Sequence, residues 1–172
     1  MVQAVRLYET GGPEVMMLEE VALDAPGPGM VTVANRAIGL NYIDTYHRSG
    51  LYPLPMPTGI GLEGAGIVEA VGEAVGGAAP LQVGDRVAYC SAGFGAYAQA
   101  LNLPAVRLVK IPQGIDFEQA AGMLLKGQTA EYLLQRTYPL QPGQTCLFHA
   151  AAGGVGLIFG QWARSIGAQV IG

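Results

Sequence analysis

Charged residues are scarce in this sequence. Asp, Glu, Lys and Arg make up only 13% of the 172 residues, and the 9 basic residues form no run. Binding to nucleic acid requires clustered Lys and Arg, so we do not expect a nucleic-acid partner. Apolar residues make up 51% of the chain. That share is enough for a large core and excludes an intrinsically disordered protein.

Cysteine is scarce as well, and long hydrophobic runs are absent. Cys90 and Cys146 belong to no spacing typical of a zinc site or a disulfide scaffold, so we expect two reduced thiols. The most apolar stretch, residues 146–160, is interrupted by His149 and by glycines and is too short to span a bilayer. The N-terminus carries no pattern of a secretory signal. We therefore expect a cytoplasmic protein without membrane insertion.

Glycine and proline, in contrast, are abundant and divide the first 110 residues into short segments. The chain has 26 glycines and 11 prolines. Between them lie apolar stretches typical of strands, and we expect a short helix over residues 42–48. The expected strands are residues 2–7, 17–23, 31–40, 62–72, 97–101 and 105–111, and residues 83–89 read as a turn that leads into a further strand. Short strands at near-regular spacing predict an antiparallel, barrel-like domain.

The pattern changes after Pro112. Asp116 and Gln119 form a capping-box pattern that predicts a helix from about residue 120, which continues or restarts after Gly127. Residues 145–148 then read as a strand, 157–166 as a helix ended by Gly167, and 168–171 as a second strand. The second part of the chain is therefore predicted to contain a β-α-β unit.

A glycine-rich turn joins the first strand of this unit to its helix. The G-x-G-x-x-G template falls on Ala151, Gly153 and Gly156, with alanine at the first position. Glycines are needed where the backbone meets a pyrophosphate and where the helix packs closely on the strand, and the helix N-terminus offers N–H groups to the phosphates. The strand before and the helix after the turn favour dinucleotide binding over a tight turn without a ligand.

The sequence resembles a known family at this turn and well beyond it, namely the zinc-independent quinone oxidoreductases of the medium-chain dehydrogenase/reductase superfamily. The matching segments are residues 37–46, 48–53, 84–87, 117–121, 143–147, 151–156 and 161–164. The resemblance implies an α/β protein with a β-barrel part. A GroES-like substrate domain would cover residues 1–125, and the start of a Rossmann cofactor domain would cover 126–172. It also implies NADPH as cofactor, quinones or other conjugated carbonyls as substrates, and a homodimer.

The same resemblance assigns site residues. Asn41 would lie near the nicotinamide or the substrate carbonyl, Tyr46 and Tyr52 would line the substrate cleft, and the Thr129 hydroxyl would approach the nicotinamide amide. The cofactor turn would comprise Ala151, Ala152, Gly153, Gly154, Val155 and Gly156. Structural roles remain open as alternatives. Asn41 also suits a turn, a helical threonine can bond back to a carbonyl, and Asp44 suits a helix cap.

No metal is expected. Zinc-dependent relatives carry a cysteine ligand where this chain has Asn41 and a Gly-His-Glu triplet where it has Gly61-Leu62-Glu63. Leucine offers no ligand atom, and the carboxylates of Asp44 and Glu63 do not rebuild the site. His47, His149 and the two cysteines show no partner arrangement for nucleophilic or acid–base catalysis.

Two other functions stay open. One is an NADPH-dependent reductase of enones or alkenals, and the other is a cofactor-binding protein without turnover, as in the crystallin relatives. The residue that contacts the ribose is expected about 20 positions beyond the turn, which lies past Gly172. The preference for NADPH over NADH therefore follows from the resemblance alone, and we expect the chain to be about half of a longer enzyme.

Overall fold

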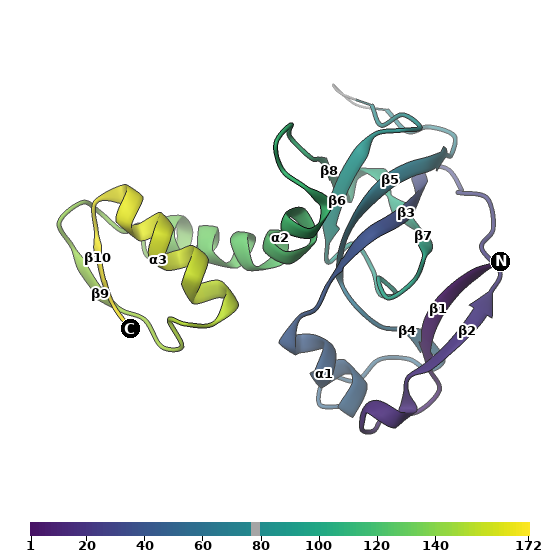
Figure 1. Ribbon diagram of the computed structural model, residues 1–172, viewed down its shortest axis with the longest axis horizontal. Helices are drawn as coiled ribbons and strands as arrows, with labels where there is room; N and C mark the ends of the chain where they lie inside the picture. Colours follow the sequence, from purple (N-terminus) through teal and green to yellow (C-terminus); the bar gives the residue numbers. More distant parts are fainter. Residues whose placement is uncertain (77–79) are drawn as a thin grey trace. The chain divides into compact units, whose positions relative to one another are not determined.

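The computed structural model describes residues 1–76 and 80–172. The chain divides into two compact units, Met1–Gly122 and Met123–Gly172 (Figure 1). The boundary falls inside helix α2 (Phe117–Tyr132). The predicted domain boundary after residue 125 also lies inside this helix.

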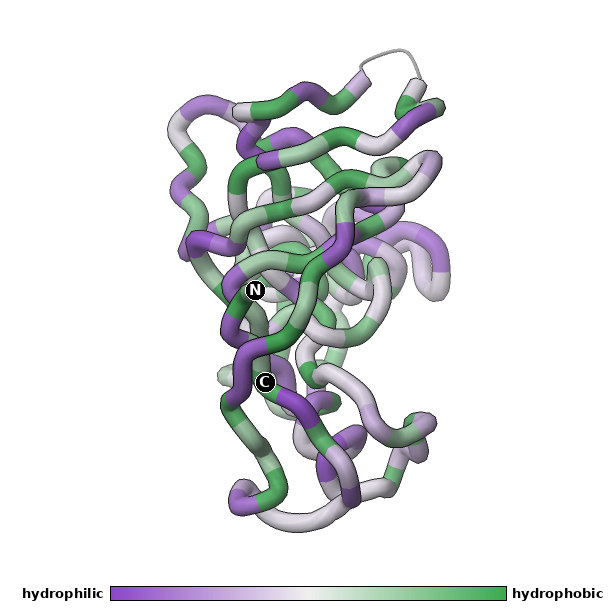
Figure 2. Tube along the Cα trace, turned by 90° about the vertical axis from the view of Figure 1, so that its right-hand side faces the viewer, coloured by the Kyte–Doolittle hydropathy of each residue, from purple (hydrophilic) through white to green (hydrophobic). Residues whose placement is uncertain are grey.

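The first unit is built on an antiparallel sheet of five strands in the order β7-β3-β5-β6-β8. Along the tube of Figure 2, apolar stretches alternate with polar ones, as expected for strands that bury one face. The core between these strands includes the fully buried Val31, Val33, Val68 and Val87. The strands are β3 (Met30–Gly39), β5 (Glu63–Val71), β6 (Arg86–Cys90), β7 (Ala100–Pro104) and β8 (Leu108–Lys110).

A second sheet of this unit has three strands in the order β2-β1-β4. They are β1 (Val2–Leu7), β2 (Met17–Val21) and β4 (Thr58–Gly59), and a short 3-10 turn, η1 (Pro13–Val15), precedes β2. The connection that leads to β7 pairs with β1. The N–H of Val5 donates to the carbonyl of Tyr97 (2.8 Å), and the N–H of Gln99 donates to the carbonyl of Gln3 (2.9 Å). These bonds join the second sheet to the segment around Tyr97.

Two bulges interrupt the pairing of β3 with β5. Arg36 is an extra residue on β3, because the residues on either side of it face consecutive residues of β5, and Glu69 is an extra residue on β5 in the same way. At Gly66, a side-chain Cβ would collide with the backbone carbonyl of Ala34, so the close approach of the two strands requires glycine there. The bent strand expected over residues 62–72 is confirmed.

Three expectations for this unit are wrong in detail. The described strands do not close into a barrel, because β7 and β8 lie at opposite edges of an open sheet and do not pair with each other. The strand expected at 97–101 begins only at Ala100, because the preceding residues pair with β1 instead. The strand expected at 105–111 is a 3-10 turn, η2 (Ala105–Arg107), followed by the three-residue β8.

The helix α1 (Tyr42–Ser49) follows directly on β3, where a short helix was expected. It ends at Gly50, whose φ of +81° lies in the left-handed region that favours glycine. The predicted capping box of α2 is also confirmed. The Asp116 carboxylate accepts the Gln119 N–H (2.6 Å), and the Gln119 side chain accepts the Asp116 N–H (3.1 Å). The helix runs without a break through Gly127 and ends in a π-helical turn, η3 (Leu133–Thr137).

The second unit contains the predicted β-α-β unit. It consists of β9 (Thr145–Leu147), α3 (Gly154–Ile166) and β10 (Gln169–Ile171), and the two strands are parallel. Gly167, with φ +91°, ends α3 as expected. The core of this unit is formed by buried side chains of α2, η3 and α3 together with one residue before β9: Ala130, Leu134, Leu140, Phe159 and Ala163.

Candidate functional site

Asn41 lies in the first unit, between the end of β3 and the start of α1. It is buried, and its backbone N–H donates to Asp44 Oδ2 (3.0 Å). Its side-chain Nδ2 donates to Glu63 Oε2 (2.8 Å) on β5. The amide of Asn41 is therefore held in a defined orientation by a carboxylate from a neighbouring strand, which sequence reasoning did not predict.

Asp44 caps α1 by accepting the Asn41 N–H, a role that the sequence left open. It also has a second contact that the sequence did not indicate. Asp44 Oδ2 accepts the Tyr97 hydroxyl (2.9 Å) across 53 positions of sequence. The other oxygen, Oδ1, is buried and has no hydrogen-bond partner among the described residues. Burial raises the pKa of Tyr97, and the nearby charge of Asp44 raises it further, so the phenol remains a donor at neutral pH. Nothing local in the sequence marks Tyr97 for this role.

Glu63 is fully buried on β5 and faces Cys90 on β6. Burial raises the pKa of the Cys90 thiol, and the negative charge of Glu63 adds to this effect. Cys90 is therefore a thiol at neutral pH. This protonated state does not suit a nucleophile.

Tyr46 and Tyr52 are brought together, as residues of one cleft wall would be. Their ring centroids lie 5.2 Å apart in an edge-to-face arrangement, and the N–H of Tyr52 donates to the carbonyl of Tyr46 (3.1 Å). Tyr42 packs on Tyr46 in the same way, with centroids 5.3 Å apart. Tyr52 is 49% exposed, so much of its ring remains open to a ligand.

The glycine turn of the second unit has the geometry that its sequence pattern requires. Gly153 is the N-cap of α3, and Gly153 and Gly154 are exposed, as is Ala152, while Ala151 and Val155 are half-buried. Gly156 is buried, and a Cβ at this position would collide with the backbone carbonyl of Ala151. The first N–H groups of a helix have no acceptor within the helix and point out of its end. The turn can therefore accept an anion at the start of α3.

Thr129 lies on the part of α2 that belongs to the second unit. Its hydroxyl donates to the carbonyl of Leu125 (3.0 Å), one turn earlier in the helix. The sequence left this hydrogen bond to the backbone open as an alternative to a contact with the nicotinamide amide. The oxygen still has lone pairs that can accept a hydrogen bond.

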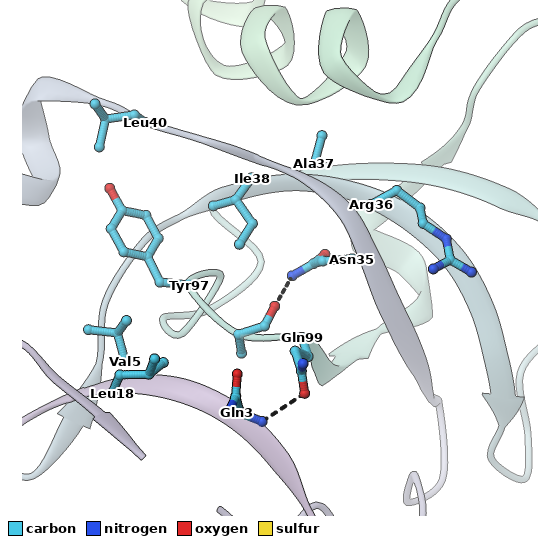
Figure 3. Close-up of a pocket in the computed structure, with 11 residues that line it drawn as sticks. Gln3, Val5, Leu18, Asn35, Arg36, Ala37, Ile38, Leu40, Tyr97 and Gln99 are labelled. Carbon is cyan, nitrogen blue, oxygen red and sulfur yellow. Dashed lines mark hydrogen bonds between the residues drawn. The ribbon is translucent and has the colours of Figure 1, made fainter. Parts of the chain in front are cut away.

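A hollow of about 530 Å³ lies in the first unit beside Tyr97 (Figure 3). Its walls are mainly apolar and include Val5, Ile38 and Leu40. Three of its polar side chains bond to other parts of the chain. Asn35 Nδ2 donates to the carbonyls of Ala96 and Ala98 (3.1 and 2.9 Å), Gln99 Oε1 accepts the Gln3 N–H (3.0 Å), and the Tyr97 hydroxyl donates to Asp44.

Two features are absent from the described residues. Residues 1–76 and 80–172 contain no group of three or more His, Cys, Asp or Glu side chains placed to hold a metal ion. No helix within these ranges combines the length and the apolar character needed to cross a bilayer.

Known proteins are similar to the whole of this chain. The alcohol dehydrogenase GroES-like domain family matches residues 27–113. A quinone oxidoreductase of Pseudomonas aeruginosa is 54% identical over 173 residues, which cover 100% of this chain and 52% of that protein. A 2-haloacrylate reductase of a Burkholderia species is 45% identical over 179 residues, covering 100% of this chain and 53% of that protein.

A solved structure agrees with these relatives. The quinone oxidoreductase of Escherichia coli, complexed with NADPH, superposes with a TM-score of 0.94 at 47% identity. The match covers 99% of this chain and 52% of that protein. The chain therefore spans about half the length of the curated relatives it matches.

Proposed function

This chain belongs to the alcohol dehydrogenase GroES-like domain family, and from that premise we propose that its protein reduces quinones with NADPH and without a catalytic zinc. The observation that carries the proposal is the glycine turn at the start of α3, set between parallel strands as a dinucleotide site requires. The similarity to a quinone oxidoreductase complexed with NADPH supports the choice of cofactor and substrate.

The second unit would hold the cofactor. The N–H of Gly153 donates to the carbonyl of Ala150 (2.8 Å) and shapes the turn. The exposed Ala152 and Gly154 would offer their backbone N–H groups to the pyrophosphate, with Ala151 and Val155 flanking the turn. The buried Gly156 lets α3 begin close to the strand that precedes it. When NADPH is bound it supplies the hydride, and the protein supplies orientation and polarity. The Thr129 oxygen would accept from the nicotinamide amide.

The first unit would hold the acceptor. Asn41, oriented by Glu63, would hydrogen-bond the acceptor carbonyl or the nicotinamide. Tyr46 and Tyr52 would line the cleft with ring faces and phenol groups. Residues 1–125 would thus form the substrate domain, and residues 126–172 the first β-α-β of the cofactor domain.

The donor set argues against zinc in this proposal. Leu62 has no ligand atom, and Asn41 Nδ2 is a hydrogen-bond donor to Glu63. The carboxylates of Asp44 and Glu63, and the Cys90 thiol whose pKa burial raises, do not replace the missing Cys and His ligands. Polarisation of the acceptor would come from amide and phenol groups instead.

The proposal extends to the protein's setting. Neither Cys90 nor Cys146 is bridged, which suits a reducing compartment such as the cytoplasm. The family resemblance further favours a homodimer.

A direct test is the oxidation of NADPH by the purified protein in the presence of a quinone, followed by the loss of NADPH absorbance. We expect quinone-dependent turnover that a chelator does not abolish. Titration of the 172-residue chain with NADPH, followed by fluorescence, tests the cofactor site separately. Absence of both turnover and NADPH binding would overturn the proposal.

A second candidate is reduction of a conjugated carbon–carbon double bond. It is favoured by the similarity to a 2-haloacrylate reductase. In this reaction the hydride goes to the β-carbon of the double bond. Parallel assays with quinones and α,β-enones separate the two candidates, because activity on enones alone would contradict quinone reduction.

A further inference from the structure

Tyr97, in the connection that leads to β7, is anchored by the backbone around it. Its N–H donates to the carbonyl of Ile60 (3.0 Å), and its carbonyl accepts the N–H of Val5 (2.8 Å). Asn35 Nδ2 donates to the carbonyls of the two residues that flank Tyr97 (3.1 and 2.9 Å). The Asn35 amide is fixed in turn, because its Oδ1 accepts the hydroxyl of the buried Tyr89 (2.9 Å). Three separate segments of the first unit therefore set the place from which the Tyr97 side chain extends.

The ring of Tyr97 packs against Gly61. The φ of Gly61 is +92°, and a Cβ at this position would collide with the Tyr97 ring, so the backbone approaches the ring as only glycine allows. Gly61 lies two positions before Glu63, whose carboxylate accepts Asn41 Nδ2 (2.8 Å). The Tyr97 ring therefore supports the segment that carries the partner of the Asn41 amide.

The hydroxyl of Tyr97 bears on the backbone of Asn41. Figure 3 shows this hydroxyl pointing toward Leu40, the residue before Asn41. It donates to Asp44 Oδ2 (2.9 Å), the same oxygen that accepts the Asn41 N–H (3.0 Å). Asp44 is only 2% exposed, and its Oδ1 has no hydrogen-bond partner among the described residues. The hydroxyl thus supplies one of the two hydrogen bonds described for this carboxylate, and the Asn41 N–H supplies the other.

We propose that Tyr97 is a positioning residue for Asn41. Its hydroxyl fixes the Asn41 backbone through Asp44, and its ring supports the Glu63 segment that holds the amide. The inference rests on the proposed function, in which Asn41 bonds the acceptor carbonyl or the nicotinamide. Tyr97 acts through the placement of Asn41 and needs no contact with either group. A displaced hydrogen-bonding group lowers the rate more than it weakens binding when its bond is strongest in the transition state.

The first test follows the NMR signals of Asn41 in the 172-residue chain, without cofactor or acceptor. Tyr97→Phe keeps the ring and removes only the hydroxyl. We expect it to shift the backbone N–H signal of Asn41 and to speed the exchange of this N–H with water by about two- to tenfold, because its acceptor loses a hydrogen bond. Tyr97→Leu also removes the ring, and it should in addition speed the exchange of the Asn41 Nδ2 protons relative to Tyr97→Phe.

Val31→Ala is the control for a general loss of stability. Val31 is fully buried on β3 and faces Val71, at the end of the strand that is far from Asn41. This variant should lower the melting temperature and leave the Asn41 signals in place. Unmoved Asn41 signals in both Tyr97 variants would overturn the proposal. So would shifts of the same size in Val31→Ala.

A second test separates this inference from the proposed function. In the reduction of a quinone with NADPH, we expect Tyr97→Phe to lower kcat by about two- to tenfold and to change KM for NADPH by less than about twofold. The proposed cofactor turn belongs to the second unit, so NADPH binding should not depend on Tyr97. A raised KM with an unchanged kcat would overturn the positioning role. Absence of turnover in the parent chain would count against the proposed function alone, since the Asn41 signals report on Tyr97 without any reaction.

Discussion

The two candidate sites of this chain are built in opposite ways. The cofactor turn of the second unit consists of neighbouring residues, 151–156, between one strand and one helix. The Asn41 site of the first unit draws on separate segments, since Glu63 comes from β5 and Tyr97 from the connection to β7. A site of the first kind depends on backbone conformation, and a site of the second kind depends on tertiary contacts. The expected effects of substitution differ accordingly.

The largest effect is expected where the backbone of the cofactor turn leaves no room. In Gly156→Ala the new Cβ would collide with the carbonyl of Ala151, so the start of α3 must shift. We expect the free energy of unfolding of this unit to fall by about 1–3 kcal/mol. NADPH affinity should fall by about tenfold or more, because the N–H groups at the helix end lose their geometry. Trp162 fluorescence during denaturation and an NADPH titration measure the two effects.

Gly160→Ala on the same helix is the control. Nothing lies within 4 Å of a Cβ at this position. Helix propensity then predicts unchanged or increased stability, by up to about 1 kcal/mol. Unchanged NADPH binding in Gly156→Ala would contradict a cofactor turn that depends on backbone geometry.

A smaller effect is expected from removing one distant contact of the Asn41 site. Tyr97→Phe deletes the hydroxyl from which Asp44 accepts a hydrogen bond, and the buried Asp44 carboxylate keeps the Asn41 N–H. We expect the free energy of unfolding to fall by about 0.5–1.5 kcal/mol, measured by denaturant titration with circular dichroism. Tyr8→Phe is the matched control, since Tyr8 makes the same kind of bond to Glu19 (2.8 Å) on the surface and should show no measurable change. Equal losses of stability in the two variants would contradict a larger contribution from the buried hydrogen bond.

The smallest change in stability is expected for a surface ion pair of the first unit. It gives a reference value for a substitution outside both candidate sites. The hydrogen bond and charge of Lys110 (2.8 Å) help to hold the pKa of Asp85 below its ordinary value. A lowered pKa stabilises the fold above the unfolded-state pKa of about 3.9, and this contribution is lost as the pH falls through the lower folded value. Lys110→Met should therefore reduce stability at neutral pH by well under about 1 kcal/mol. The difference from the parent chain should shrink as the pH falls and should vanish once Asp85 is protonated in the folded state, and a difference that persists after this protonation would contradict the pairing.

Local patterns predicted much of the fold. The capping box at Asp116 and Gln119, the end of α3 at Gly167 and the β-α-β unit depend on residues close in sequence, and all three are confirmed. Partner choice between distant strands is not local. β7 begins later than the expected strand because Tyr97 and Gln99 bond to β1. The alternation along each strand also does not show which strands lie at the open edges of the five-stranded sheet.

The candidate sites divide in the same way. The residues of the candidate cofactor turn are consecutive in sequence, so the glycine pattern with the strand and helix around it predicts them as a group. In the first unit, the resemblance drew attention to Asn41, Tyr46 and Tyr52, but the groups that support them were missed. Tyr97 reaches α1 only through the tertiary fold, and its neighbours in sequence carry no pattern that marks it.

The extra residue Arg36 on β3 also bears on how this protein can change in evolution. Side chains alternate between the two faces of a strand, and the bulge at Arg36 reverses that alternation shortly before Asn41. Loss of the Arg36 codon would place Asn35 and Ala37 next to each other, opposite the consecutive β5 residues Gly66 and Ala65. The ladder would then be regular, and the residues that lead to Asn41 would keep both their partners and their faces. Gene variants that lack this one residue should therefore be tolerated better than variants that lose a residue of β6, whose pairing with β5 and β8 has no bulge to absorb the change.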